Sequence, residues 1–113
     1  MRFVDQPLSS EKISILRKDS GDYLKLTVDI ENEWLVAGGE LHADAEKLLL
    51  DKGSKQDNIW GGGINLKDRQ IDTTAVLNLR PRMNNDNLEI LDHKRREKFI
   101  KIVKKLFKNY GLK

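Results

Sequence analysis

The chain has 113 residues, enough for one domain with a modest hydrophobic core. Its 21 Lys and Arg residues against 18 Asp and Glu give a net charge of +3, and its 38% hydrophobic residues fall in periodic runs, which excludes a disordered chain. Cysteine is absent, which excludes disulfides, thiolate metal sites and cysteine nucleophiles. Neither a run of about 20 apolar residues nor a signal-peptide segment is present, so we expect a cytoplasmic protein without a membrane partner.

The charge is distributed unevenly along the chain. Residues 92–113 contain nine Lys and Arg against two Asp and Glu, whereas the preceding residues contain 12 against 16. The basic character therefore belongs to one C-terminal element.

The N-terminal 21 residues predict a short strand followed by a helix. Arg2–Val4 can form an edge strand. Ser9 has the position of a helix N-cap, and Gly21 follows the last helical residue. Leu8 and Ile13 are spaced to form a hydrophobic staple around the cap.

A hairpin and a second helix are predicted next. Residues 22–30 alternate strictly between apolar and polar side chains, which indicates a half-buried strand. Residues 31–33 form a polar turn, and residues 34–37 return as the partner strand. A helix is then expected over residues 43–52, closed by Gly53.

The second half of the chain predicts two more strands and a last helix. The strands are expected at residues 58–66 and 71–80, with Pro81 ending the second one. The helix begins between residues 87 and 92 and runs to about Asn109. The order is (β)αββαββα, which predicts a single α+β domain over residues 1–113, with three helices and an antiparallel sheet of four to five strands.

The first candidate site comprises Glu40, His42 and Asp44. If the preceding strand extends this far, its period of two places all three side chains on one face. Such a set could bind a divalent cation, or place a histidine general base beside an orienting carboxylate, so these three are the candidate catalytic residues. If the helix already begins at His42, the three side chains diverge and the segment is only a polar helix entry.

The second candidate feature is the glycine triplet at residues 61–63. Glycine-rich loops can bind phosphate, but neither the Walker lysine pattern nor a strand–GxGxxG–helix context is present. Because the triplet lies inside a predicted strand, it indicates a β-bulge or a close approach of another part of the backbone.

A third polar set is predicted around the strand at residues 71–80. Asn78 and Arg80 lie on the side of that strand opposite its apolar residues, and the planar guanidinium of arginine suits bidentate binding of carboxylate or phosphate. The alternative is a solvated sheet face with ion pairs to Glu40 or Asp44. The candidate ligand-binding residues are Lys55, Gln56, Asn65, Asn78 and Arg80, with Ser54 and Arg82 beside them.

The last helix presents a lysine face. An apolar stripe of Phe99, Ile102, Val103 and Leu106 is suited to docking on the sheet. The opposite face could bind the phosphates of nucleic acid, although no aromatic residue interleaves the lysines, or it could simply be solvated. It carries Lys94, Lys98, Lys101, Lys104, Lys105 and Lys108.

Several segments of the chain together resemble a known family. Residues 38–44 read GGELHAD, residues 53–60 read GSKQ followed after three residues by Trp60, and GINL and NLRP follow. This combination resembles a family of small bacterial and archaeal proteins known as a domain of unknown function. The resemblance implies a prokaryotic cytoplasmic protein and brings no activity or catalytic residue. That family has one glycine before Ile-Asn-Leu where this chain has three, which implies a longer bulge or loop near Asn65.

Three functions remain open from the sequence. The first is a site for a small anionic ligand, with or without a divalent cation, formed by residues 38–44 and 78–81 and catalytic as a special case. The second is a homodimeric or partner-binding module that uses the exposed sheet face or the region of Trp60. The third is binding of nucleic acid or another polyanion through the lysine face. No resident cofactor is expected.

Overall fold

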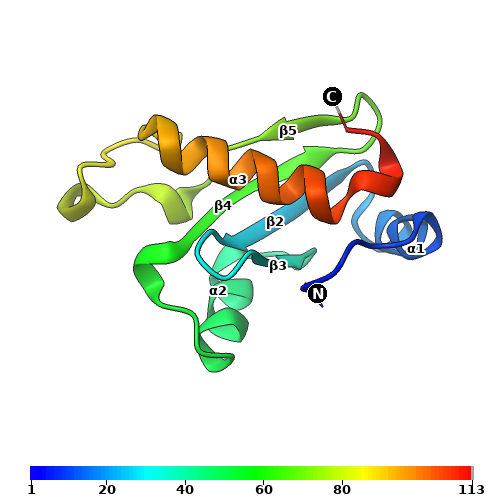
Figure 1. Cartoon of the computed structure of the whole chain (residues 1–113), viewed down its shortest axis with the longest axis horizontal. Coiled ribbons are helices and arrows are strands. Elements are labelled where there is room, and N and C mark those ends of the chain that lie inside the picture. The colour runs from blue at the N-terminus through cyan, green and yellow to red at the C-terminus, as the bar shows by residue number, and fades with distance from the viewer. Residues whose placement is uncertain (113) are drawn as a thin grey trace.

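A computed structural model describes residues 1–112, which form a five-stranded antiparallel sheet and three α-helices (Figure 1). The spatial strand order is β1-β3-β2-β4-β5, and every neighbouring pair is antiparallel. The α+β class and the order of elements are therefore as predicted. The elements are β1 (Arg2–Val4), α1 (Ser10–Ser20), β2 (Tyr23–Asp29), β3 (Trp34–Ala37), α2 (His42–Asp51), β4 (Ile59–Asn65), β5 (Gln70–Asp72) and α3 (His93–Leu106).

One face of the sheet is covered by α3, which lies across the strands (Figure 1). Leu24, Leu26 and Val28 are one side of the alternating pattern of β2, and all three are completely buried on this face. They belong to one core cluster with the predicted apolar stripe of α3. None of the helices in residues 1–112 is long and apolar enough to cross a membrane.

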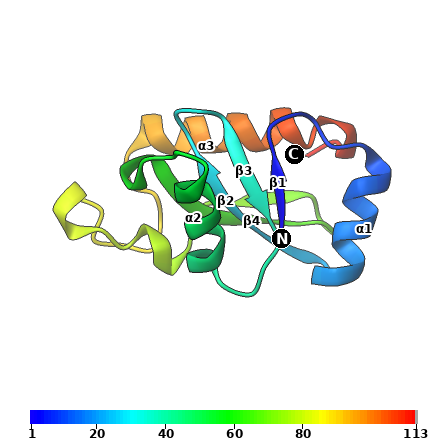
Figure 2. The same ribbon diagram turned by 90° about the horizontal axis from the view of Figure 1, so that it is seen from below.

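The other face of the sheet is only partly covered. Figure 2 shows α2 and α3 on opposite sides of the sheet, with α1 at one end. Under α2 a second, smaller cluster buries Val36, Ala45, Leu49 and Ile59. The start of β2 lies outside this cover, and Tyr23 remains 40% exposed there.

The predicted signals of the first helix are confirmed, and the last helix starts directly after its N-cap at Asp92, the end of the predicted range. The hydroxyl oxygen of Ser9 accepts a hydrogen bond from the Lys12 amide at 3.2 Å, and Leu8 and Ile13 of the staple are both buried. Asp92 caps α3 by accepting from the Arg95 amide. The last helix ends at Leu106, earlier than expected, and a 3-10 turn at residues 108–110 follows it.

Asp29 stabilises the predicted hairpin turn from a fully buried position. Its carboxylate accepts hydrogen bonds from the backbone amides of Glu31 and Asn32, from the Asn32 side chain, and from the Ser54 hydroxyl at 2.5 Å. Burial alone would raise the pKa of Asp29, but these hydrogen bonds outweigh it and lower that pKa. Ser54, which the sequence placed beside a ligand site, therefore joins its loop to the hairpin.

The predicted strand over residues 71–80 is wrong beyond Asp72. The chain leaves the sheet there, forms a 3-10 turn at residues 76–78, and extends from one end of the molecule before α3 (Figure 1). The alternation fails at Leu79, which belongs to the predicted apolar face but is 49% exposed. Asn78 is instead completely buried, so Asn78 and Arg80 do not share an exposed strand face.

The side chain of Asn78 replaces the missing strand as a partner for β4. Its Oδ1 accepts from the Gly61 amide at 2.8 Å, and its Nδ2 donates to the Gly61 carbonyl at 2.9 Å. The same Nδ2 also lies within hydrogen-bond distance of the carbonyls of Thr73 and Leu88. A primary amide can do this because it carries a donor and an acceptor side by side, as a peptide does. Asn78 therefore has a structural task.

The glycine triplet produces no bulge. Gly61, Gly62 and Gly63 pair in unbroken register with Thr27, Leu26 and Lys25 of β2. The alternative expectation, a close backbone approach, is confirmed, because a Cβ on Gly62 would lie 2.1 Å from the carbonyl oxygen of Asp72. The longer bulge or loop implied by the family resemblance near Asn65 is therefore not formed.

We expect Gly62→Ala to lower the free energy of unfolding by about 2–3 kcal/mol, because the backbone carbonyl and the Phe99 ring 2.8 Å away both have to move. Gly61→Ala meets side chains only, the Ala75 methyl group at 2.8 Å and the His42 ring at 3.1 Å, and should cost less, about 1 kcal/mol. Urea denaturation of the two variants tests the order. A Gly62→Ala protein as stable as the wild type would contradict it.

Candidate functional site

The three candidate catalytic residues do not share a face. The strand ends at Ala37, and α2 begins at His42, so the period of two does not apply between Glu40 and Asp44. Glu40 and Asp44 are exposed, whereas His42 is half-buried. Within residues 1–112, no three His, Asp or Glu side chains converge as metal ligands. The shared-face arrangement is therefore wrong, because the helix starts too early for it.

His42 is directed from the first turn of α2 towards the sheet. Its Nε2 lies 3.0 Å from the carbonyl oxygen of Gly62, and because a carbonyl only accepts, Nε2 carries the proton. Gly61 makes room for the ring, since a Cβ there would lie 3.1 Å from His42 Cδ2. Burial lowers the pKa of His42, the charge of Lys25 adds to this, and the Gly62 carbonyl opposes it. The folded protein therefore holds His42 as a neutral imidazole at pH 7.

A hollow of about 570 Å³ opens beside His42, on the part of the sheet that α2 leaves uncovered. Its rim is apolar, because Leu41 is 60% and Val76 76% exposed. Lys25 and Tyr23 of β2 contribute a cation and a hydroxyl. The hollow is lined by Tyr23, Lys25, Leu41, His42, Ala43, Thr74, Ala75, Val76 and Leu77.

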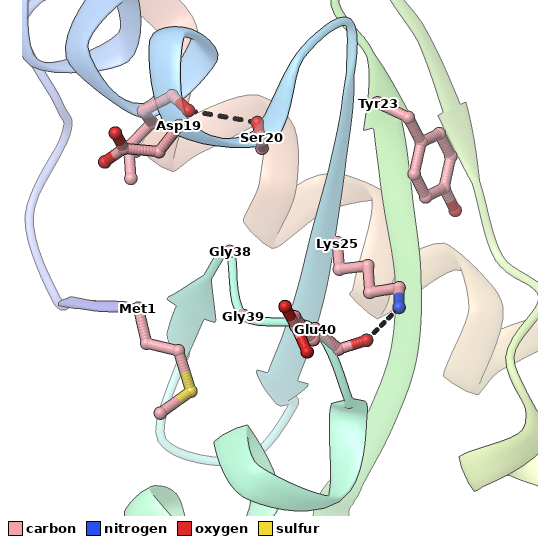
Figure 3. A pocket seen from close by; sticks show the side chains of 9 residues that line it. Met1, Asp19, Ser20, Tyr23, Lys25, Gly38, Gly39 and Glu40 are labelled. Carbon is pink, nitrogen blue, oxygen red and sulfur yellow. Dashed lines mark hydrogen bonds between the residues drawn. The ribbon is translucent and has the colours of Figure 1, made fainter.

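A second hollow of about 390 Å³ adjoins the first at Lys25 and Tyr23 (Figure 3). It lies between the end of α1 and the turn at residues 38–40, with Met1 at its edge. Figure 3 shows the Lys25 side chain extending to Glu40, whose carbonyl oxygen accepts its hydrogen bond. Lys25 thus lies at the boundary of both hollows.

The hydroxyl of Tyr23 is fixed by Asp72, to which it donates at 2.9 Å. The other oxygen of that carboxylate accepts from the amide and the hydroxyl of Thr74 at 3.0 and 2.6 Å. The Tyr23 ring lies against Gly63, where a Cβ would come within 2.5 Å of Cζ. Burial raises the pKa of Tyr23, and the hydrogen bond to Asp72 raises it further. The Tyr23 hydroxyl is therefore uncharged, and it already donates its hydrogen bond to Asp72.

Arg80 lies apart from these hollows. It is 7% exposed, its Nη2 lies 3.3 Å from Glu46 Oε2, and its guanidinium carbon is 4.7 Å from the centre of the Trp60 ring. Arg95 contacts the same indole at 4.3 Å. Within residues 1–112, Nη1 of Arg80 has no hydrogen-bond partner. Glu46 follows His42 by one helical turn, so both lie on the same side of α2. Arg80 contacts this side at Glu46, and the hollow contacts it one turn earlier, at His42.

The other predicted ligand-binding residues do not converge with His42. Lys55 and Gln56 are exposed in the loop before β4. Asn65 Oδ1 accepts from the amides of Lys67 and Asp68 and so closes the turn after β4. Arg82 forms an exposed ion pair with Asp57 at 2.7 Å.

Sequence reasoning missed Tyr23, Lys25 and Thr74 as site residues. The alternation of β2 had placed Tyr23 and Lys25 on its polar side. The missing information was that α2 covers this side only in part.

We expect Arg80→Met to cost about 3 kcal/mol of unfolding free energy, because it leaves the 15%-exposed side chain of Glu46 without its cation. Adding Glu46→Leu should restore most of that loss. The exposed pair offers the control, since Arg82→Met should leave the free energy of unfolding nearly unchanged. Thermal unfolding of the three variants tests this, and a double variant no more stable than the single one would refute the pairing.

Because of His42, the free energy of unfolding should decrease as the pH is lowered. Its folded pKa lies below the unfolded value of about 6.5, so the unfolded chain binds more protons below that pH. The free energy of unfolding should therefore be unaffected by His42 above about pH 7.5 and decline as the pH falls through 6.5. His42→Gln should remove this part of the decline, whereas His93→Gln on the exposed side of α3 should retain it. Denaturation between pH 5 and 8 measures the difference.

The comparisons with known proteins bear on the family of this chain. A search of curated proteins and a search of solved structures each gave no match. The family model described as "Protein of unknown function (DUF5674)" matches residues 2–106. This agrees with the resemblance to an uncharacterised family that the sequence motifs suggested. Since the match spans nearly all of the chain, the protein belongs to the DUF5674 family of proteins of unknown function.

Proposed function

We propose that this protein binds a small molecule with one anionic group and an apolar body in the 570 Å³ hollow between β2, the start of α2 and residues 74–77. The observation that carries the proposal is the state of Lys25. Its ammonium group is bonded to the neutral carbonyl of Glu40 and forms no ion pair within residues 1–112. A partly buried cation at the floor of a hollow favours an anionic partner.

The side chains around Lys25 support its assignment as the group that binds the anion. Asp72, on the paired strand beyond Gly63, already accepts hydrogen bonds from Tyr23 and Thr74. His42 is neutral and donates to a backbone carbonyl, so it adds no positive charge that would compete with Lys25 for the anionic group of the ligand. The anionic group would therefore meet one ammonium group, and Lys25 would exchange the carbonyl of Glu40 for it.

The walls of the hollow favour an apolar body on the ligand. Leu41 and Val76 expose most of their side chains there, and Ala43, Ala75 and Leu77 extend the same wall. Burying about 100 Å² of apolar surface contributes roughly 2.5 kcal/mol. Together with one charge-assisted hydrogen bond, this is consistent with a dissociation constant between about 10 µM and 1 mM.

We propose binding in preference to catalysis. Nε2 of His42 carries its proton into the hydrogen bond to Gly62, so only Nδ1 could act as a general base, and the burial that lowers the pKa of His42 disfavours the imidazolium that such a base would form. Glu40 and Asp44, the other candidates, do not line this hollow. His42 instead anchors the start of α2 on the sheet, which shapes the wall of the binding site.

The test is an NMR titration with octanoate, and with octanol and inorganic phosphate as single-feature probes. Octanoate should shift the amides of Lys25, His42 and Thr74–Leu77 more strongly than either probe. Lys25→Met should weaken octanoate at least about ten-fold, because it removes the charge and keeps the length of the side chain. Val76→Asp should weaken it as well by placing a like charge at the rim.

Lys18→Met on α1 provides the matched control, since Lys18 is exposed and lines neither hollow. It should bind octanoate as the wild type does. Shifts confined to other surfaces, or an affinity unchanged by Lys25→Met, would refute the proposal.

A further inference from the structure

The outer side of α3 carries a continuous line of cations. We call Lys94, Lys98, Lys101 and Lys105 the basic ridge. Their spacings of four, three and four residues keep them on one side of the helix, all exposed, along about 17 Å of its axis. The opposite side of α3 is in the core. The ridge therefore faces away from the sheet, and the sheet separates it from the hollow at His42.

Within residues 1–112 the basic ridge is almost uncompensated. Lys105 alone meets a carboxylate, that of Glu33 at 3.4 Å, and both side chains of this pair are more than half exposed. Glu97, the acid inside α3, lies 3.5 Å from Nε2 of His93 and forms an ion pair with it only when that imidazole is protonated. An exposed ion pair such as that of Lys105 with Glu33 contributes little to stability.

Folding does not require this arrangement. Buried residues of α3 already dock it on the sheet, and like charges at i,i+4 such as Lys94–Lys98 and Lys101–Lys105 slightly destabilise a helix. A surface that only had to be soluble would mix both signs of charge. A single-sign line therefore indicates a partner of the opposite charge.

We propose that the basic ridge binds the phosphate backbone of double-stranded nucleic acid without reading its sequence. A duplex carries one phosphate per 3.4 Å along each strand, so 17 Å of ridge faces about five phosphates of one strand. Hollows of about 490 and 430 Å³ flank Lys98 and Lys101 on either side, the first also lined by Glu31 and Glu33 and the second by Glu97.

The composition of the surface favours a duplex over the alternative polyanions. No Phe, Tyr or Trp side chain of α3 is exposed, so bases of a single strand would find no large aromatic ring on the helix to stack on. No large apolar side chain of α3 is exposed either, and an anionic membrane surface would require some to insert. Duplex backbone binding needs only the cations that are present.

The experiment measures anisotropy of a labelled duplex of about 20 base pairs against salt concentration. The wild-type protein should bind at about 50 mM salt, with log K falling against log salt with a slope between about −3 and −5. The triple variant Lys98→Gln, Lys101→Gln, Lys105→Gln should bind at least about 100-fold more weakly, with a slope near −1.

The control triple variant is Lys12→Gln, Lys18→Gln, Lys67→Gln. It changes the net charge equally at exposed positions outside the ridge, so it should retain most of the affinity. Circular dichroism confirms that both triple variants fold. Absence of wild-type binding at low salt would overturn the proposal, and so would equal losses in the two triple variants. Tighter binding to a single strand, or to phosphatidylserine vesicles in place of the duplex, would overturn it too.

Discussion

The structure depends on the absence of side chains in the middle of β4. Gly62 allows Phe99 of α3 and the backbone at Asp72 to approach one face of the strand, and Gly61 allows the ring of His42 to approach the other. Close packing in protein interiors leaves no room for even one extra methyl group at such contacts. Because both layers meet at this one interior strand, the constraint sets the distance between α2, the sheet and α3.

The same constraint creates the candidate site. His42 lies against the sheet only because Gly61 is bare, and its bond to the Gly62 carbonyl fixes where α2 starts. Tyr23 crosses the bare Gly63 to reach Asp72. The uncovered area between these two side chains is the hollow, so its shape follows from where the glycines permit neighbours to approach.

Much of the fold could be predicted from local signals, and the site only in part. Strict alternation in β2, the Ser9 cap and the apolar stripe of α3 are local patterns whose meaning does not depend on distant residues. The strand predicted over residues 71–80 failed because its alternation was accidental: Asn78 turned inward to complete the hydrogen bonds of β4. Arg80 was recognised as a residue with an anionic partner, but the partner is Glu46 of α2, which only tertiary structure could reveal.

The side-chain amide of Asn78 also has a consequence for the border of the sheet. After Asp72 the outer margin of β4 has no neighbouring strand, and exposed strand margins invite pairing with other chains. Asn78 engages both backbone groups of Gly61, and Asn85 in turn holds the Asn78 carbonyl, so the margin is closed by a tethered loop. A foreign strand could add there only by displacing two buried amides, which protects the protein against edge-to-edge aggregation on this side.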